Sequence, residues 1–249
     1  NKSEFNDILK PFYAHQILNR KNYELPVDVL SSTPDIETRL HKTAAKLVAR
    51  PKGIFAADES GGNIHKKFET IGLEDTFENR RAYREMFFKT PDIENYLSGI
   101  ILFEETTEQN TSEGINFVEY LKNRGILVGV KLDGGLQPLT GFEGETISIG
   151  LDSLIEKLQK YSKVGIDFAK WRVAFEIDEE KGTPSEAAIT SNLRVLAEYA
   201  KACQNYGIVP IVEPEVRYTL GSWYPFVKNY SRARAEKLQK RFLKNFLRN

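Results

Sequence analysis

Five charged residues stand out because each follows a short apolar run, directly or two residues later. They are Asp58, Lys131, Lys170, Glu213 and Glu215. A lysine among carboxylates, above an apolar floor, can attack a carbonyl group as a nucleophile or hold a phosphate as a cation. Carboxylates in the same place can move protons to and from carbinol oxygens. Charged residues at strand ends also cap, form ion pairs or face water, but five in equivalent positions favour a functional site.

A second candidate site is the sequence Ser-Gly-Gly-Asn at residues 60–63, which follows the first apolar run and opens a helical stretch. Backbone N–H groups at such a helix start could bind a phosphate, although Gly-Gly after a strand also forms plain turns. We interpret the three histidines, His15, His41 and His65, as surface residues, and we expect no metal site and no cofactor. Trp171 is interpreted as a packing residue rather than a stacking platform.

The segments that would position these residues alternate between apolar runs and amphipathic stretches. The apolar runs predict strands at residues 53–57, 99–103, 126–130, 166–169 and 208–212. These runs are apolar throughout rather than alternating, as in strands that are covered on both faces. Apolar residues at three- and four-residue spacing predict helices at residues 78–89, 112–122, 152–163 and 185–205. The ends of three helices are marked by Gly125, Gly165 and Gly207.

This βα alternation predicts a parallel sheet with helices outside it, and the charged residues favour a barrel over an open sheet. Each apolar run is followed by a charged residue: Asp58, Glu104, Lys131, Lys170 or Glu213. A (β/α)8 barrel builds its site from several strand ends, whereas an open sheet uses one switch point and usually a GxGxxG motif, which is absent. The strand ends are spaced by about 39 residues, a usual unit length for a barrel. Only 36 residues follow Glu213, so we expect about five of the eight βα units.

The composition of the 249 residues, 41% apolar and 28% charged, fits one large domain or two small ones. It excludes a wholly disordered chain, a collagen and a coiled coil. A single cysteine, Cys203, excludes a disulfide framework and a Cys-based zinc site, and it favours a reducing compartment. No apolar run reaches the ~18 residues of a membrane span, and residues 1–32 lack a signal-peptide core, so we expect a cytoplasmic protein.

Charge is distributed unevenly, although 35 basic and 35 acidic residues cancel. Residues 217–249 contain nine Lys or Arg and one acid, Glu236, so this segment carries +8 and the rest of the chain −8. A change of that size favours a segment with another role or origin. We therefore divide the chain into an N-terminal extension at residues 1–35, a partial barrel at 36–216 and a basic tail at 217–249.

The segments around the charged residues resemble class I fructose-bisphosphate aldolases over residues 36–216. The matching segments are GIFAADESGGNI (53–64), ENRRAYREMF (78–87), SGIILFEET (98–106), VGVKLDGGLQPLTG (128–141), GETISIGLD (144–152), DFAKWRVAF (167–175) and GIVPIVEPE (207–215). The most specific are Lys-Trp-Arg and Val-Glu-Pro-Glu at the fourth and fifth predicted strand ends. The resemblance implies a (β/α)8 TIM barrel and a glycolytic reaction, the reversible cleavage of fructose 1,6-bisphosphate to dihydroxyacetone phosphate and glyceraldehyde 3-phosphate.

The resemblance also implies roles for individual residues. Asp58 resembles the carboxylate near the C3–C4 bond of the substrate, and Lys131 resembles a phosphate and substrate contact. Lys170 resembles the lysine that polarises the reacting oxygens, with Arg172 beside it. Glu213 resembles the general acid/base for carbinolamine dehydration, and Glu215 is its strand-end partner.

Departures from the family pattern bear on activity. Ser60 resembles a phosphate contact, but Asn63 stands where the family commonly has a serine. The family's Schiff-base lysine lies on the sixth strand in a segment resembling LLKPN, and this sequence has no such segment. A later phosphate-binding loop and arginine are also missing. We therefore expect a chain that is truncated or altered after residue 216 and inactive as it stands.

The expected ligand is a sugar phosphate, and five strands with open edges predict self-association or a homo-oligomer. The alternative is a non-catalytic sugar-phosphate-binding or interaction protein, in which residues 231–249 form a basic helix with Leu238, Phe242 and Phe246 on one stripe. Such a helix suits an acidic partner, a membrane surface or nucleic acid, although a solvated tail without function explains it as well. We do not expect a nucleic-acid partner.

Overall fold

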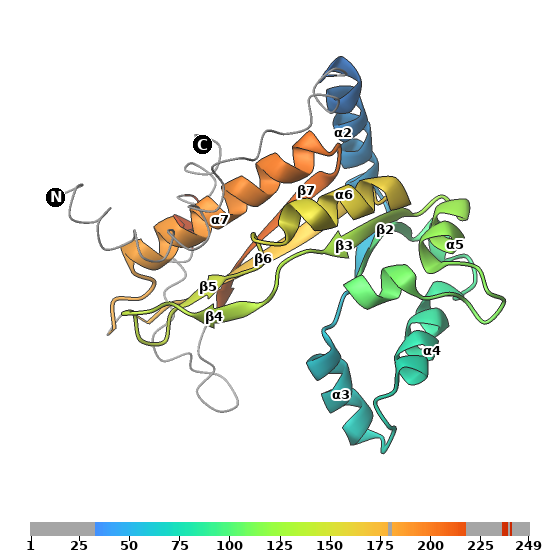
Figure 1. Ribbon diagram of the computed structural model, residues 1–249, viewed down its shortest axis with the longest axis horizontal. Helices are drawn as coiled ribbons and strands as arrows, with labels where there is room; N and C mark the ends of the chain where they lie inside the picture. The colour runs from blue at the N-terminus through green and yellow to red at the C-terminus, as the bar shows by residue number, and fades with distance from the viewer. Residues whose placement is uncertain (1–32, 179–180, 218–235, 239, 241–249) are drawn as a thin grey trace.

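The apolar runs form the sheet that the sequence predicts. In the computed structural model, which describes residues 33–178, 181–217, 236–238 and 240, five strands lie in the order β1-β2-β3-β6-β7 (Figure 1). The strands are β1 (Gly53–Ala57), β2 (Leu97–Leu102), β3 (Leu127–Lys131), β6 (Phe168–Glu176) and β7 (Val209–Arg217). All four neighbouring pairs are parallel, so their carboxyl ends lie at the same edge. This five-stranded arc confirms the expected partial barrel.

Helices connect the strands and most of them cover one face of the sheet, whereas the first described helix, which precedes β1, adds Leu47 to the cluster on the other face. Over residues 33–217 they are α2 (Thr33–Leu47), α3 (Gly61–Thr70), α4 (Phe77–Phe88), α5 (Phe117–Asn123), α6 (Leu154–Val164) and α7 (Glu186–Asn205), with two short 3-10 helices at Ile93–Asn95 and Glu104–Glu108. Figure 1 shows α6 and α7 along the same face. The Ser185 hydroxyl caps α7 by accepting a bond from the Ala188 N–H at 3.1 Å. Gly165 ends α6 in the left-handed conformation, as predicted, with a φ of 83°.

The two faces of the sheet bury different apolar side chains. The helix-covered face belongs to the large core, which includes Ile100, Val130 and Trp171. The opposite face, called the inner face below, carries a smaller cluster formed by Leu47, Ile101, Leu127 and Phe168. Val209 and Ile211 lie half-buried beside this cluster. Because successive strand residues point to opposite faces, Lys131 and Lys170 share the inner face with Phe168.

The Phe168 ring explains two glycines within the apolar runs. A Cβ atom on Gly129 would lie 2.3 Å from Phe168 Cε2, and one on Gly99 would lie 3.0 Å from Phe168 Cε1. Gly129 is also the direct register partner of Phe168 across β3 and β6. The aromatic ring therefore packs closely against both β2 and β3 because these positions have no side chain.

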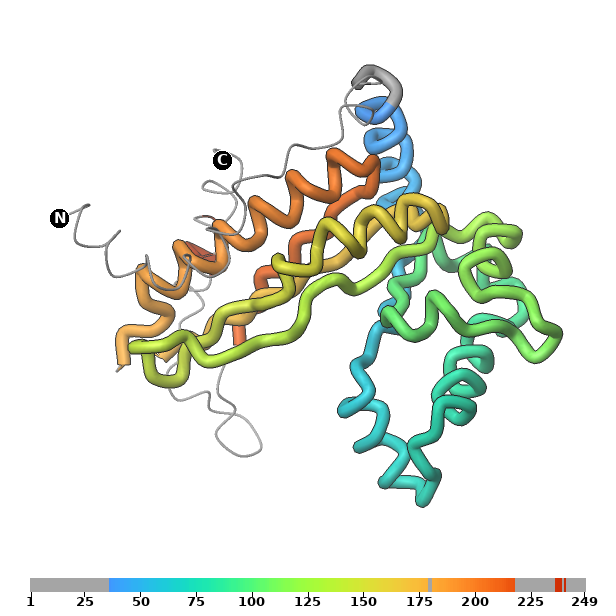
Figure 2. The backbone as a smooth tube through the Cα atoms, viewed as in Figure 1, coloured from blue at the N-terminus to red at the C-terminus, as the bar shows by residue number. Residues whose placement is uncertain are grey.

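A hairpin that the sequence analysis did not predict interrupts the connection between β3 and α6. Its antiparallel strands are β4 (Leu136–Pro138) and β5 (Thr146–Ser148), and Figure 2 shows the chain running away from α3 and α4 before it returns. The buried Asn192 side chain on α7 donates to the Thr146 carbonyl at 2.9 Å and accepts from the Ser148 N–H at 3.1 Å. These two bonds dock the edge of the hairpin onto α7.

The three element boundaries that differ most from the prediction lie in β6, β7 and α5. Lys170 and Glu213 were expected at strand ends, but both lie inside their strands, since the β6–β7 ladder continues to the pair Glu176 and Arg217. Beyond Lys170 the strand still buries Trp171, Val173, Ala174 and Phe175, and only Arg172 interrupts them before Glu176. The end of the continuous apolar run therefore does not mark the end of the strand. Helix α5 begins at residue 117 rather than 112, because residues 110–116 form a turn closed by a bridge.

The described part of the basic tail is short. Residues 236–238 and 240 are helical, and the Leu238 side chain is buried in the large core. The rest of the predicted basic helix at 231–249, with Phe242 and Phe246, lies outside the described residues. Among the residues that are described, no helix is both long enough and apolar enough to cross a membrane.

Candidate functional site

Lys170 lies at the centre of the cluster that the sequence predicted. Its Nζ atom is 2.7 Å from Asp58 Oδ2 and 3.0 Å from Glu213 Oε2. Asp58 follows β1, Lys170 comes from β6 and Glu213 from β7, so the fold joins three strands that are far apart in sequence. The Lys170 and Asp58 side chains are only 12% and 9% exposed, whereas Glu213 is 38% exposed. The group is therefore a partly buried ion-pair network with one open side.

The surroundings of Lys170 set its charge. Burial lowers the pKa of Lys170, but hydrogen bonds and attraction from Asp58 and Glu213 outweigh burial and raise that pKa above its ordinary value. Lys170 is therefore an ammonium group near neutral pH. In this state it can attract phosphate or carbonyl oxygens, but it has no free electron pair with which to attack carbon.

Lys131 sits beside Lys170 but pairs with a residue that the sequence analysis did not select. Lys131 and Lys170 are register partners across β3 and β6. Lys131 Nζ lies 2.6 Å from Asp133 Oδ1 and donates to the Asp133 carbonyl at 2.7 Å. The buried Asp133 carboxylate also accepts from the Gly135 N–H at 3.1 Å and the Arg172 N–H at 3.3 Å. Its place two residues after Lys131, in Lys-Leu-Asp-Gly-Gly, was the available signal.

Glu215 and Arg172 form a second ion pair, further along the same two strands. The Arg172 Nε atom donates to Glu215, and Arg217 Nε lies 3.5 Å from Glu215 Oε1. The hydrogen bond from Arg172 lowers the pKa of Glu215, and the same bond raises the pKa of Arg172. Because Arg172 is the register partner of Glu213, this pair lies next to the Lys170 network.

Ser60 and Asn63 lie at the start of α3, just after Asp58. Ser60 is the N-cap residue, but its hydroxyl makes no capping bond, and its carbonyl accepts from the N–H groups of Asn63 at 2.9 Å and Ile64 at 3.1 Å. The Asn63 side chain is exposed, and a Cβ added to Gly61 would meet nothing within 4 Å. The described hydrogen bonds do not join Ser60 or Asn63 to the two lysines, so the start of α3 is an open, separate corner of the site.

Other residues considered in the sequence lie outside this cluster. Glu104 pairs with Lys157 of α6 rather than with the two lysines. His65 is half-exposed on α3, 3.3 Å from Glu69 and 3.4 Å from Asp75, and His15 lies outside the described residues. Within the described residues, no group of three or more His, Cys, Asp or Glu could hold a metal ion. Trp171 is fully buried and packs on Tyr199 with a ring distance of 5.2 Å, which confirms a packing role.

The fold and the cluster together define a class of protein. A parallel sheet with helices on its outer face, whose neighbouring strands bring lysines and carboxylates together on the inner face, is the arrangement of a partial (β/α) barrel. The family model "Fructose-bisphosphate aldolase class-I" matches residues 39–221, and the chain belongs to that family.

Individual relatives agree with this assignment. The chain is 49% identical over 185 residues to fructose-bisphosphate aldolase C-B of Danio rerio, covering 74% of this chain and 50% of that protein. It is 48% identical over 178 residues to a probable class 1 aldolase of Xanthomonas campestris, covering 72% and 53%. The structure matches the Plasmodium falciparum aldolase, solved with TRAP and a small-molecule inhibitor, at a TM-score of 0.71 and 44% identity, covering 73% of this chain and 52% of that one. The chain thus spans about half the length of the curated relatives it matches.

Proposed function

We propose that this chain binds sugar phosphates of the aldolase reaction, fructose 1,6-bisphosphate and dihydroxyacetone phosphate, through the cluster around Lys170. Lys131 and the Ser60 corner would contact a phosphate, Asn63 would stand beside it without replacing the family serine, and Lys170 would polarise the reacting oxygens. Asp58 and Glu213 would face the carbon chain as proton carriers. Arg172 and Glu215 would form a second ion pair of the binding site, next to Lys170 and Glu213.

The observation that carries this proposal is the position of Lys170 Nζ between Asp58 and Glu213, at 2.7 Å and 3.0 Å. Three strands bring one cation and two carboxylates to the partly open inner face of the barrel. An anionic ligand can replace one of the carboxylates as the partner of Lys170, and the displaced carboxylate is then free to accept a proton.

We further propose that the 249-residue chain binds these ligands without cleaving them. A class I aldolase needs a neutral lysine amine that forms an iminium with the ketose C2 carbonyl. Lys170 is held as an ammonium by two carboxylates, and Lys131 is paired with Asp133. Neither lysine of the cluster therefore suits the nucleophilic role, and the printed sequence has no segment like that of the family's Schiff-base lysine.

Calorimetric titration with dihydroxyacetone phosphate tests the binding proposal. We expect weak, saturable binding, and we expect Lys131→Met to weaken it about tenfold, since a charge-assisted hydrogen bond contributes roughly 1.5–3 kcal/mol. Lys157→Met is a matched control, because Lys157 is also a partly buried, ion-paired lysine but contacts Glu104 on the helix side. Absence of binding by the unmodified chain, or equal weakening by both variants, would contradict the proposal.

A further inference from the structure

Arg84 is a buried cation that the proposed mechanism does not use. It lies on α4, its side chain is 2% exposed, and it is among the largest fully buried side chains of the described residues. Burial lowers the pKa of Arg84, because charge is costly away from water. A buried guanidinium needs hydrogen-bond partners that compensate for its lost hydration. The partners of Arg84 therefore indicate which part of the structure it stabilises.

The partners of Arg84 are the backbone carbonyls on the two sides of Asp58. Arg84 Nε donates to the Ala57 carbonyl at 2.8 Å, and Arg84 Nη2 donates to the Glu59 carbonyl at 2.9 Å. The ladder between β1 and β2 ends at Ala57, so Asp58 is the first residue beyond the sheet. The planar guanidinium thus fixes the backbone by two hydrogen bonds at the point where the strand pairing of the sheet ends.

Neighbouring groups reinforce these two hydrogen bonds. The Arg84 guanidinium lies 5.7 Å from the centre of the Tyr83 ring, and its Nη2 atom is 4.0 Å from Glu59 Oε2. Glu59 in turn forms an ion pair with Lys67 of α3. Arg84 therefore connects α4, the end of β1 and the start of α3.

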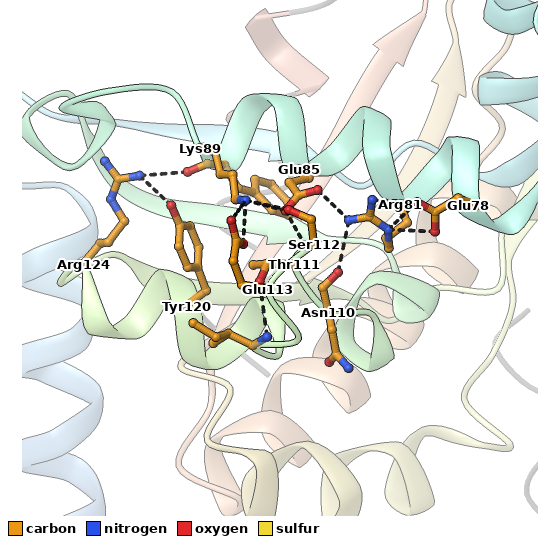
Figure 3. A network of polar contacts seen from close by, with 12 residues as sticks. Glu78, Arg81, Glu85, Lys89, Asn110, Thr111, Ser112, Glu113, Tyr120 and Arg124 are labelled. Atoms are coloured by element: carbon orange, nitrogen blue, oxygen red, sulfur yellow. Dashed lines mark hydrogen bonds and ion pairs between the residues drawn. The ribbon is translucent and has the colours of Figure 1, made fainter.

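Helix α4 is itself firmly anchored on another side (Figure 3). Glu85 accepts from Arg81 Nη1 at 2.6 Å and from the Ser112 N–H at 2.6 Å, and Lys89 Nζ lies 2.6 Å from Glu113. The contacts with Ser112 and Glu113 tie α4 to the turn before α5, and the Arg81 bond holds Glu85 in place within α4. Arg84 consequently reaches the end of β1 from a fixed support.

We propose that Arg84 is a positioning residue for the site: by holding the carbonyls on both sides of Asp58, it directs the Asp58 carboxylate toward Lys170 Nζ. Arg84 does not touch Lys170 or Glu213 in the described contacts, so it acts through Asp58. The consequence for ligand binding rests on the proposed function, whereas the consequence for Lys170 does not.

The test is an NMR titration of the Lys170 side chain in the full chain and in Arg84→Met. We expect the pKa of Lys170 to fall by about one unit in the variant, because the ammonium stays buried but loses its closest carboxylate. Removal of a nearby positive charge alone would instead raise the pKa of Lys170. The sign of the shift therefore separates positioning from a simple charge effect.

Two further variants complete the test. Arg84→Lys keeps the positive charge but lacks the planar guanidinium that donates to both carbonyls, so we expect a smaller fall in the pKa of Lys170. If Arg84→Met does not fold, the Arg84→Lys variant provides the test. Arg124→Met is the control, because Arg124 also donates to two carbonyls, of Phe88 at 3.0 Å and Thr90 at 3.2 Å, at the far end of α4. We expect it to leave the pKa of Lys170 unchanged.

A rise or no change in the pKa of Lys170 in the Arg84 variants would overturn the inference, as would an equal fall in Arg124→Met. Titration of the same variants with dihydroxyacetone phosphate separates this inference from the proposed function. A fall in the pKa of Lys170 together with no binding by the unmodified chain would refute the proposed function and support the role of Arg84. Binding that persists unchanged in Arg84→Met would refute the ligand consequence of the inference and leave the proposed function intact.

Discussion

Neighbouring carboxylates decide what Lys170 can do. A lysine in an apolar pocket loses its proton easily and becomes a nucleophile, whereas a lysine between carboxylates stays charged. Asp58 at 2.7 Å and Glu213 at 3.0 Å place Lys170 in the second group. The sequence predicted that these three residues meet, because each follows an apolar run. The sequence did not show that Lys131 forms an ion pair with Asp133, or that Arg84 donates to the carbonyls on both sides of Asp58. Both contacts depend on how the chain packs.

Glu85 offers a pH-dependent test at the same scale. Burial alone would raise the pKa of Glu85, but hydrogen bonds from Arg81, Ser112 and Lys89 lower it to about 2 from its usual 4.5. The stability that Glu85 contributes is therefore complete above about pH 4.5 and is lost as the pH falls toward 2. We expect Glu85→Gln to reduce the free energy of unfolding by about 2 kcal/mol at pH 7 and by about half as much at pH 3.

Urea denaturation at the two pH values measures this difference. Glu113→Gln is the control, because Glu113 pairs with the same Lys89 but is mostly exposed, and we expect only a small change from it. An equal loss of stability at pH 7 and pH 3 in Glu85→Gln would show that the carboxylate charge is not the cause.

The packing of strands β3 and β6 depends on a missing side chain. A Cβ atom at Gly129 would come within 2.3 Å of the Phe168 ring on the inner face. We expect Gly129→Ala to reduce the free energy of unfolding by about 1–3 kcal/mol through overpacking, and the further change Phe168→Leu to recover part of the loss. Gly53→Ala on β1 is the matched control, because a Cβ there meets nothing within 4 Å. Equal urea midpoints for the two alanine variants would contradict the close approach.

The sequence predicted elements well where one periodicity dominated. Continuous apolar runs located all five parallel strands, and the glycines before β6 and β7 marked the helix ends. Strand β6 continues past Lys170 because Trp171, Val173 and Phe175 remain buried on alternate positions, and Lys170 and Arg172 hide this pattern by interrupting the apolar run. Strand β7 continues beside it to the pair Glu176 and Arg217. The β4–β5 hairpin was missed because three-residue strands carry too little periodicity, and Asn192, which docks it, lies on a distant helix.

At the scale of the molecule, the described residues form an open sheet. Within the described residues, β1 pairs only with β2 and β7 only with β6, and Ile54 on the inner face of β1 is 38% exposed. Unpaired edges and an incompletely covered apolar face favour association. We therefore expect the chain to form concentration-dependent oligomers, measured by light scattering after size-exclusion chromatography.

A charged substitution on the inner face tests whether the chain associates through this face or aggregates non-specifically. We expect Ile54→Lys to shift the oligomer toward the monomer, since a lysine there would have to be buried in the contact. Val164→Lys at the end of α6 is the control, because Val164 has a similar exposure of 42% but lies away from the inner face. A monomer at every concentration tested would refute self-association.

The most direct test of the central claim, that this site binds a sugar phosphate without forming a Schiff base, is borohydride trapping with dihydroxyacetone phosphate. Borohydride reduces an iminium between a lysine and the ketone to a stable secondary amine, which intact mass spectrometry detects. Because Lys170 is held as an ammonium between two carboxylates, we expect no stoichiometric adduct on the 249-residue chain under conditions that saturate binding. One equivalent of adduct on a single lysine would contradict the account, and peptide mapping would identify the residue that acts as the nucleophile.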